Sequence, residues 1–270
     1  MSQTRYPIFL VHGTGFRDKK HLNYWGRIPK ALNDWGAEIA YGHQAAWGTV
    51  ADNAVILGRN ITRHISETGC GKVNIIAHSK GGVEARYLAS TLDCGHLIAS
   101  ITTVATPHHG SKTMDAIQKL PSWIMRVIAL PVNGVAKLIG DKKPDFFTVC
   151  AQFTTEHMKK FNDSNPDVEG IYYQSYASAM KSSFSDVIML FQNVVVRLIE
   201  GENDGMVTIT SARWTNFKDI WRGSSRRGIS HVDTVDIRRR RLTKKVAQEG
   251  VVDICDCYIA IAEELKRMGF

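Results

Sequence analysis

Short apolar runs and longer amphipathic stretches alternate along the first part of the chain. The apolar runs are bounded by glycine or polar residues and predict buried strands at residues 6–11, 37–41, 72–77 and 97–105. Between these strands, apolar residues recur at helical spacing and predict helices at residues 22–35, 50–66 and 82–92. Strands that alternate with helices of this length are joined by right-handed crossovers and pair in parallel. The pattern therefore predicts an α/β fold, with a mostly parallel sheet that is flanked by helices.

The alternation is then interrupted by residues 108–150, which contain no convincing strand pattern. It resumes with two apolar runs that predict strands at residues 171–176 and 194–199. The last part of the chain, at about residues 243–268, has helical spacing. The sequence contains no repeats and no low-complexity tracts. We therefore expect a single domain over residues 1–270, with an inserted segment at residues 110–150.

The length and the cysteines place the chain among ordinary globular proteins. A chain of 270 residues can bury most of its unfolded surface, so neither disulfides nor a metal are needed for stability. Its five cysteines lack the spacing of a disulfide framework, which favours reduced structural thiols and an intracellular protein. No signal peptide is visible, so we expect a cytoplasmic protein, or one secreted without such a signal. The apolar stretch at 120–139 contains charged residues and a proline, and is not expected to cross a membrane.

The net charge of +8 raises the possibility of an anionic partner. Much of this charge lies late in the chain, at Arg222, Arg226, Arg227, Arg238, Arg239, Arg240, Arg241, Lys244 and Lys245. No zinc finger, RNA-recognition motif or helix-turn-helix pattern accompanies these residues, so we expect no nucleic-acid partner. We interpret the basic cluster as a solvated face. The alternative is that it attracts an anionic surface or substrate near the active site.

A candidate nucleophile lies between the predicted strand at 72–77 and the helix that follows it. Ser79 has a small residue two positions before it, Ala77, and another two positions after it, Gly81. A serine in such a tight strand-to-helix turn is typical of a nucleophile elbow, which exposes the hydroxyl at the helix N-terminus. The alternative is a serine that caps an ordinary helix. Because the strand and the helix fall where the mechanism needs them, we predict that Ser79 is the catalytic nucleophile.

A glycine-containing loop, His-Gly-Thr-Gly-Phe at residues 12–16, follows the first predicted strand directly. Glycine allows the backbone to turn an N–H group toward the nucleophile. We expect the N–H groups of Thr14 and Lys80 to form the oxyanion hole, through the main chain, so that their side chains matter little. A simple turn is the alternative for this loop taken by itself.

A serine nucleophile needs a base, and the base needs a carboxylate that orients it. Asp204 follows the predicted strand at 194–199, in a loop at the carboxyl edge of the sheet, and Glu202 is the fallback acid. When the chain order is nucleophile, acid and histidine, the base must be His231, the only histidine after Asp204. His78 adjoins the serine, but its side chain is expected to point away and to pack under the elbow.

Four segments together resemble bacterial triacylglycerol lipases of the Proteus, Pseudomonas and Burkholderia kind. They are YPIFLVHG at residues 6–13, AHSKGG at 77–82, NDGMV at 203–207 and HVD at 231–233. The resemblance implies an α/β-hydrolase fold and hydrolysis of carboxylic esters through an acyl-enzyme, with Ser79, Asp204 and His231 as the triad. The chain departs from the family at Ala77, where glycine is usual, and at Lys80, where glutamine or methionine is common. A short-chain carboxylesterase, an acyltransferase and a thioesterase are alternatives on the same triad.

The resemblance also implies a structural calcium ion, although the chemistry itself requires no cofactor. Many of these lipases bind Ca²⁺ near the catalytic histidine through an aspartate two residues after it, and Asp233 has that position. Asp186 is the candidate for the second ligand, with a loose match in spacing. An inward-pointing run of arginines at 238–241 would repel a cation, and pairing of Asp233 with an arginine is the alternative.

The inserted segment at 110–150 is expected to be a lid over an acyl pocket. It has an apolar surface in two pieces broken near Pro131, made of Leu120, Trp123, Ile124, Val127, Ile128, Val135, Leu138 and Ile139. Apolar helices of this kind can cover a pocket and open toward lipid. Permanent packing into the core is the alternative. We therefore expect a lipid or ester substrate and contact with a lipid–water interface through the lid.

Overall fold

A parallel sheet forms the centre of the protein in the computed structural model, which describes residues 3–18, 23–138, 140–224, 227–243 and 250–270. Within these ranges the sheet has six strands, in the order β2-β1-β3-β4-β5-β6. All neighbouring strands are parallel. The strands are β1 (Ile8–Val11), β2 (Ile39–Tyr41), β3 (Val73–His78), β4 (Ile98–Val104), β5 (Tyr172–Ser178) and β6 (Phe217–Trp221).

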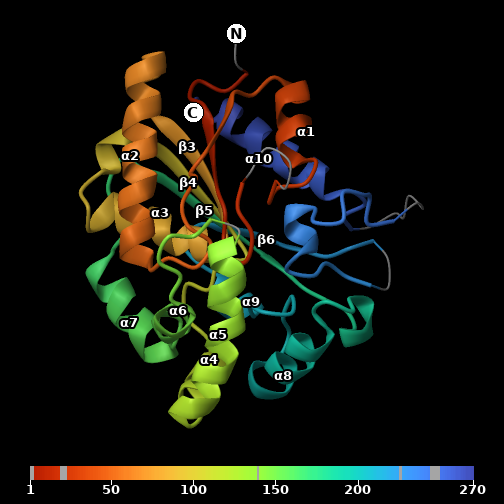
Figure 1. Ribbon diagram of the computed structural model, residues 1–270. Helices are drawn as coiled ribbons and strands as arrows, with labels where there is room; N and C mark the ends of the chain where they lie inside the picture. Colours follow the sequence, from red (N-terminus) through yellow and green to blue (C-terminus); the bar gives the residue numbers. More distant parts are fainter. Residues whose placement is uncertain (1–2, 19–22, 139, 225–226, 244–249) are drawn as a thin grey trace.

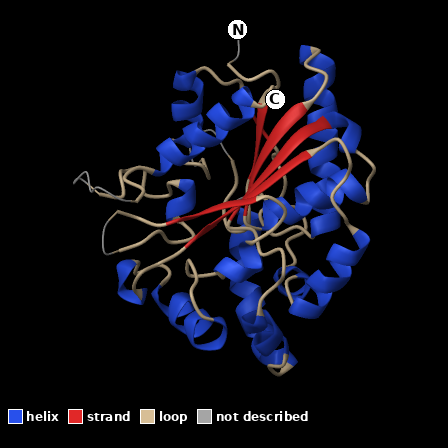
Figure 2. Ribbon diagram, turned by 180° about the vertical axis from the view of Figure 1, so that it is seen from behind, coloured by secondary structure: helices blue, strands red, loops and turns tan. Residues whose placement is uncertain are grey.

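Helices cover both faces of the sheet (Figures 1 and 2). One face packs against α2 (Val50–Thr68) and α3 (Lys80–Ser90), and the other packs against α1 (Ile28–Trp35) and α10 (Ile254–Arg267). Strand β1 serves both layers, because Ile8 and Leu10 belong to the core beneath α1 and α10 while Phe9 and Val11 belong to the core beneath α2 and α3. Burial on both faces explains why its sequence is a continuous apolar run.

The remaining helices gather toward one end of the sheet, at the bottom of Figure 1. Four follow β4, namely α4 (Lys112–Gln118), α5 (Ser122–Leu138), α6 (Phe146–Gln152) and α7 (Thr155–Ser164). Two more lie between β5 and β6, namely α8 (Leu190–Glu200) and α9 (Ile209–Ala212). Short 3-10 turns occur at Gly95–Leu97, Ser183–Ser185 and Asp233–Val235. Helices α4 to α9 lie in the segments that follow the carboxyl ends of β4 and β5, where α/β proteins place their ligands.

The first four predicted strands and the α/β fold are confirmed, but the prediction of a strand at 194–199 is wrong. Those residues belong to α8, whose buried side chains, Asn193 and Val196, lie three residues apart on one face. The sixth strand, β6, was not predicted because it lies at the edge of the sheet and only its last residue, Trp221, is buried. Pro131 lies inside α5 and does not divide it into two pieces.

Some predictions concern residues outside the described ranges. Leu22, at the start of the first predicted helix, lies there, and α1 begins at Ile28. Ile139, Arg226, Lys244 and Lys245 also lie outside the described residues, and the last helix begins at Ile254. None of the described helices is long and apolar enough to cross a membrane. All five cysteines lie within the described part, and they are free thiols.

Candidate active site

Ser79 occupies a strained turn between β3 and α3. Its backbone angles are φ 54° and ψ −129°, a conformation that non-glycine residues rarely adopt. The turn leaves no room for a side chain at Gly81, where a Cβ atom would lie 2.5 Å from the carbonyl oxygen of Val11. Ala77 is fully buried, so its small side chain matches the space available. This geometry is that of a nucleophile elbow and differs from an ordinary serine cap, since the Ser79 side chain makes no capping hydrogen bond.

Thr14 and Lys80, whose amides are expected to form an oxyanion hole, line the same pocket as Ser79. Lys80 is the first residue of α3, where amides lack an acceptor within the helix and the helix dipole favours negative charge. Within the described part of the chain, neither the Lys80 amide nor the Thr14 amide donates a hydrogen bond. Gly13 allows the loop to approach the elbow, because a Cβ atom there would lie 2.8 Å from the Cβ atom of Ser79. Two free donors therefore remain beside the candidate nucleophile.

Asp204 and His231 are hydrogen-bonded and buried. The Nδ1 atom of His231 lies 2.8 Å from Oδ2 of Asp204, and the His231 amide donates to the Asp204 carbonyl oxygen at 2.7 Å. The Ser178 hydroxyl, at the end of β5, donates to Oδ2 of Asp204 at 3.0 Å, and the amides of Met206 and Val207 donate to Oδ1. A carboxylate held in this way fixes the orientation and tautomer of the imidazole, leaving its Nε2 atom as a base.

The structure places Asp204 at the sheet edge in a way that the sequence did not indicate. Its loop follows helix α8 and is attached to the end of β5 by the Ser178 hydroxyl and to the segment after β5 by the Met180 amide, which donates to the carbonyl oxygen of Asn203 at 3.0 Å. Gly205 has a φ of 111°, and a side chain there would collide with Met189. Glu202, the fallback acid, is half-exposed and pairs with Arg222 instead of His231.

Within the described residues, no hydrogen bond joins the Ser79 hydroxyl to His231. The imidazole of His231 packs instead against His78, the residue before the serine, with ring centroids 4.5 Å apart. The structure thus brings the candidate acid and the candidate base together and holds the His231 ring against the residue before Ser79. Catalytic hydrogen bonds are often long in enzymes without substrate and shorten when the substrate binds.

An apolar pocket of about 240 Å³ opens onto the Ser79 side chain. Thr14 and Lys80 line it from the oxyanion side, and Met206 and Val207 line it from the loop of Asp204. Most of the remaining wall comes from the segment predicted as a lid, through Ser111, Met114, Ile117, Leu120, Phe146, Val149 and Cys150. Such a lining suits a hydrocarbon chain, because apolar surface is removed from water when the chain enters.

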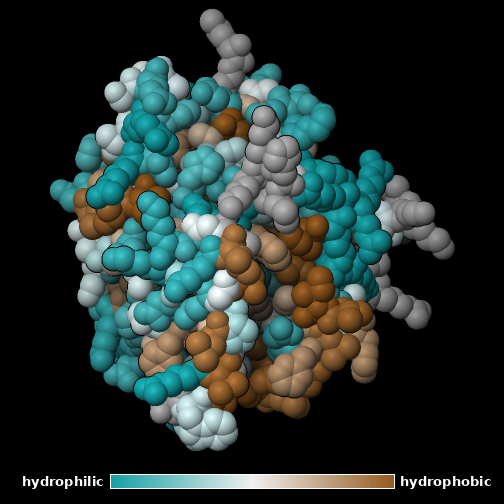
Figure 3. All heavy atoms as spheres, viewed as in Figure 1, coloured by the Kyte–Doolittle hydropathy of each residue, from teal (hydrophilic) through white to brown (hydrophobic). Residues whose placement is uncertain are grey.

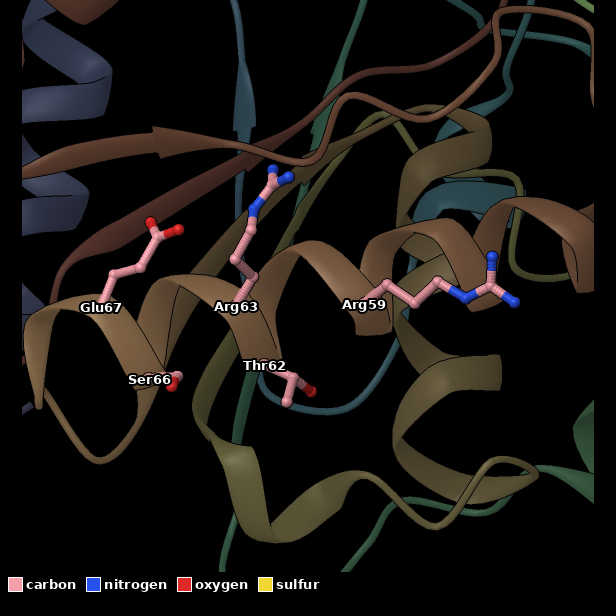
Figure 4. Close-up of a pocket in the computed structure, with 5 residues that line it drawn as sticks. All are labelled: Arg59, Thr62, Arg63, Ser66 and Glu67. Atoms are coloured by element: carbon pink, nitrogen blue, oxygen red, sulfur yellow. The ribbon is translucent and has the colours of Figure 1, made fainter.

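A second hollow, of about 540 Å³, lies along helix α2 (Figure 4). Its lining consists of polar and charged side chains from this one helix, namely Arg59, Thr62, Arg63, Ser66 and Glu67. None of these residues belongs to the candidate triad or to its oxyanion donors. The apolar pocket at Ser79 is therefore the candidate substrate site.

The Lys80 side chain is buried beneath the elbow, a feature that the sequence analysis missed. Its ammonium group forms an ion pair with Glu84 one helical turn later and donates to the carbonyl oxygen of Gly48 at 3.1 Å. Asn53 donates to the same Glu84 oxygen at 2.7 Å. The spacing of four residues could have suggested the pair, but only the fold reveals that both side chains are buried.

Asp186 and Asp233, the candidate calcium ligands, lie together but do not fit a cation. Arg238 donates to Asp186 at 2.6 Å and to Asp233 at 2.7 Å, and Arg227 donates to the same two carboxylates at 3.4 and 3.0 Å. Two positive groups therefore stand where Ca²⁺ would need oxygen ligands. Among the described residues, no group of three or more His, Cys, Asp or Glu side chains could hold a metal ion.

Comparisons with individual known proteins find lipases both by sequence and by structure. No protein-family model matches the chain. It is 29% identical over 259 residues to a triacylglycerol lipase of Vibrio cholerae, covering 87% of this chain and 81% of that protein. It is 26% identical over 271 residues to triacylglycerol lipase 2 of Saccharomyces cerevisiae, covering 94% and 78%. The structure of a Staphylococcus hyicus lipase superposes with a TM-score of 0.68 at 18% identity, over 99% of this chain and 97% of that one, which shows a shared fold.

Proposed function

We propose that this chain is a carboxylic-ester hydrolase of the α/β-hydrolase superfamily and that it cleaves lipid esters at Ser79. It is similar to triacylglycerol lipases in sequence and to a bacterial lipase in fold. The observation that supports this most is the buried Asp204–His231 pair held against a strained serine turn, beside an apolar pocket. The sequence relatives support the reaction class. The apolar lining of the pocket supports a substrate with a hydrocarbon chain.

In the proposed mechanism, Nε2 of His231 removes the proton of the Ser79 hydroxyl as the oxygen attacks the ester carbonyl. Asp204 stabilises the imidazolium ion that forms, since it accepts the hydrogen bond from Nδ1. The amides of Thr14 and Lys80 donate to the developing oxyanion. His231 then protonates the leaving alcohol, and a water molecule releases the acid from the acyl-enzyme by the same steps in reverse. No step requires a metal ion.

We also propose that the segment at 110–150 acts as a lid and contacts the lipid–water interface. Helix α5 exposes Trp123, Val127, Leu130, Val135 and Leu138, with exposed fractions between 58% and 87%. Helix α8 and the turn before it expose Phe184, Val187, Phe191 and Leu198, with exposed fractions between 74% and 86%. In Figure 3 the apolar side chains gather over the lower half of the molecule, where these helices lie. An exposed apolar surface of this extent favours contact with lipid over permanent exposure to water.

The nucleophile assignment is tested by Ser79→Ala. This variant should fold normally, lose hydrolysis of p-nitrophenyl esters and fail to react with a fluorophosphonate probe. Ser66→Ala, on the second hollow along α2, is the matched control and should retain both activities. Full hydrolysis by Ser79→Ala would show that another residue is the nucleophile.

The substrate class is tested by comparing esters with acyl chains of two to eighteen carbons, below and above their solubility limits. A lipase with the proposed lid should favour long chains, and its rate should rise when an emulsion forms. A preference for short soluble esters with no rise at the solubility limit would identify a carboxylesterase instead.

A further inference from the structure

His78, the residue before the candidate nucleophile, is buried between two hydroxyl groups. Its Nδ1 atom lies 2.7 Å from the Tyr24 hydroxyl oxygen, and its Nε2 atom lies 2.8 Å from Oγ1 of Thr234. The exposed fraction is 1% for His78 and 0% for Thr234. Both ring nitrogens are therefore used in hydrogen bonds, which simple packing under the elbow would not require.

The position of each proton follows from the bond that Thr234 makes at its other side. The single hydroxyl proton of Thr234 is donated to the backbone carbonyl oxygen of His231, at 2.5 Å. Oγ1 of Thr234 must then accept a proton from His78, so Nε2 carries the hydrogen of the neutral ring. Nδ1 is left as the acceptor of the Tyr24 hydroxyl proton. The three bonds thus point in one direction, from Tyr24 through His78 and Thr234 to His231.

The charge states of His78 and Tyr24 agree with this assignment. Burial, together with the nearby His231 and His12 rings, holds the pKa of His78 well below its ordinary value, so the ring stays neutral. Burial raises the pKa of Tyr24 above its ordinary value, so the phenol keeps the proton that it donates. A hydrogen bond from the Gly13 backbone opposes that rise.

The chain of hydrogen bonds connects two parts of the active site that are distant in the sequence. At one end, the Tyr24 hydroxyl lies against Gly13 of the oxyanion loop, where a Cβ atom would come within 2.9 Å of it. At the other end, Thr234 holds the carbonyl group of His231 and receives a hydrogen bond on its own carbonyl oxygen from Tyr258, at 2.9 Å. In the middle, the His78 ring packs against the His231 ring.

We propose that His78 is a positioning residue whose hydrogen bonds to Tyr24 and Thr234 fix the backbone of His231 relative to the oxyanion loop. This inference rests on the proposed function, because it assigns His231 the role of base. His78 itself touches no reacting atom. Its fixed tautomer sets the direction of the Thr234 hydroxyl, and that hydroxyl sets the position from which the His231 ring reaches Ser79.

The test uses substitutions that remove one hydroxyl each and leave the shape of the core nearly unchanged, since removal of His78 could prevent folding. Thr234→Val and Tyr24→Phe should each lower kcat for a soluble p-nitrophenyl ester by about 10- to 100-fold, because small displacements of catalytic groups have effects of this size. KM should change by less than about twofold, since neither residue lines the substrate pocket. Thr234→Ser retains the hydroxyl and should restore most of kcat.

The double variant distinguishes a connected chain from two independent packing defects. The two hydroxyls act through the same imidazole, so loss of the second should add less than about threefold to the loss caused by the first. Tyr87→Phe removes a tyrosine hydroxyl elsewhere and should leave kcat unchanged. Losses that multiply in the double variant, or Thr234→Ser as inactive as Thr234→Val, would overturn the proposal. Reaction of these variants with the fluorophosphonate probe at Ser79 would show that the proposed function stands even if the positioning role fails.

Discussion

Arg238→Ala tests whether arginines replace a cation in holding the loop that contains His231. The Arg238 guanidinium joins Asp186 and Asp233, whose side chains are at most 3% exposed, while about one fifth of its own surface is exposed. Loss of one partner of a buried ion pair costs about 3–5 kcal/mol. Because Arg227 still contacts both carboxylates and water can reach the site, we expect the lower end, about 3 kcal/mol. At roughly 2–4 °C per kcal/mol, the melting temperature should fall by about 6–12 °C.

The assay is thermal unfolding with EDTA or with millimolar Ca²⁺, followed by ester hydrolysis. The unmodified chain should show the same melting temperature and activity in both, because its two carboxylates are already neutralised by arginine. The Arg227→Ala/Arg238→Ala double variant should be stabilised by Ca²⁺, since it exposes the two carboxylates to the ion. Arg240→Ala, an exposed neighbour, is the control and should behave as the unmodified chain. A melting temperature of the unmodified chain that falls in EDTA or rises with Ca²⁺ would refute this reasoning.

Four other outcomes can be measured. Asp204→Asn should lower kcat by about 10⁴-fold, as in a well-studied serine triad, and a small effect in steady-state kinetics would exclude it as the acid. Lys80→Met leaves the charge of the fully buried Glu84 carboxylate without its partner and should lower the free energy of unfolding in urea titrations by about 3–5 kcal/mol. Most of this loss should be recovered in Lys80→Met/Glu84→Gln, and an equally unstable double variant would contradict the pairing. Leu198→Ser removes an apolar side chain that is 82% exposed, and it should weaken adsorption to triglyceride emulsions by about tenfold. Hydrolysis of soluble esters should not change. Unchanged adsorption would place the interface contact elsewhere. Burial opposes ionisation of Asp186, but hydrogen bonds from Ser230 and Arg238 outweigh it and hold the pKa of Asp186 below its ordinary value. The contribution of Asp186 to stability is therefore lost as the pH falls below about 4. Asp186→Asn should flatten this part of the curve of stability against pH, and an unchanged slope would argue against the pairing.

The strand before the candidate nucleophile was predictable because its burial is continuous. Strand β3 is fully buried, and its apolar run ends at a turn where only small residues fit. Periodicity failed where an element is only partly buried. The exposed apolar side chains of α8 resembled the composition of a strand, while β6 has too few buried positions to be recognised at the sheet edge.

The placement expected for Asp204 rested on a strand that the structure does not contain. Asp204 was chosen because a strand was expected before it, yet a helix precedes it, and its loop is held instead by contacts with β5. The role expected for Asp186 and Asp233 came from resemblance alone. The structure gives these carboxylates two arginine partners, one of them 52 residues from Asp186 in the sequence.

The sequence by itself determined the α/β fold and the strand–turn–helix around Ser79, because burial periodicity and turn sterics are properties of neighbouring residues. It also singled out the candidate base, since His231 is the only histidine after Asp204. Only the tertiary structure decided which side chains meet across the sheet edge. Tyr24 contacts His78 from 54 positions away, and Thr234 contacts it from 156 positions away. The local sequence pattern does not predict such contacts, since they arise when parallel strands bring the loops at their carboxyl ends to one place.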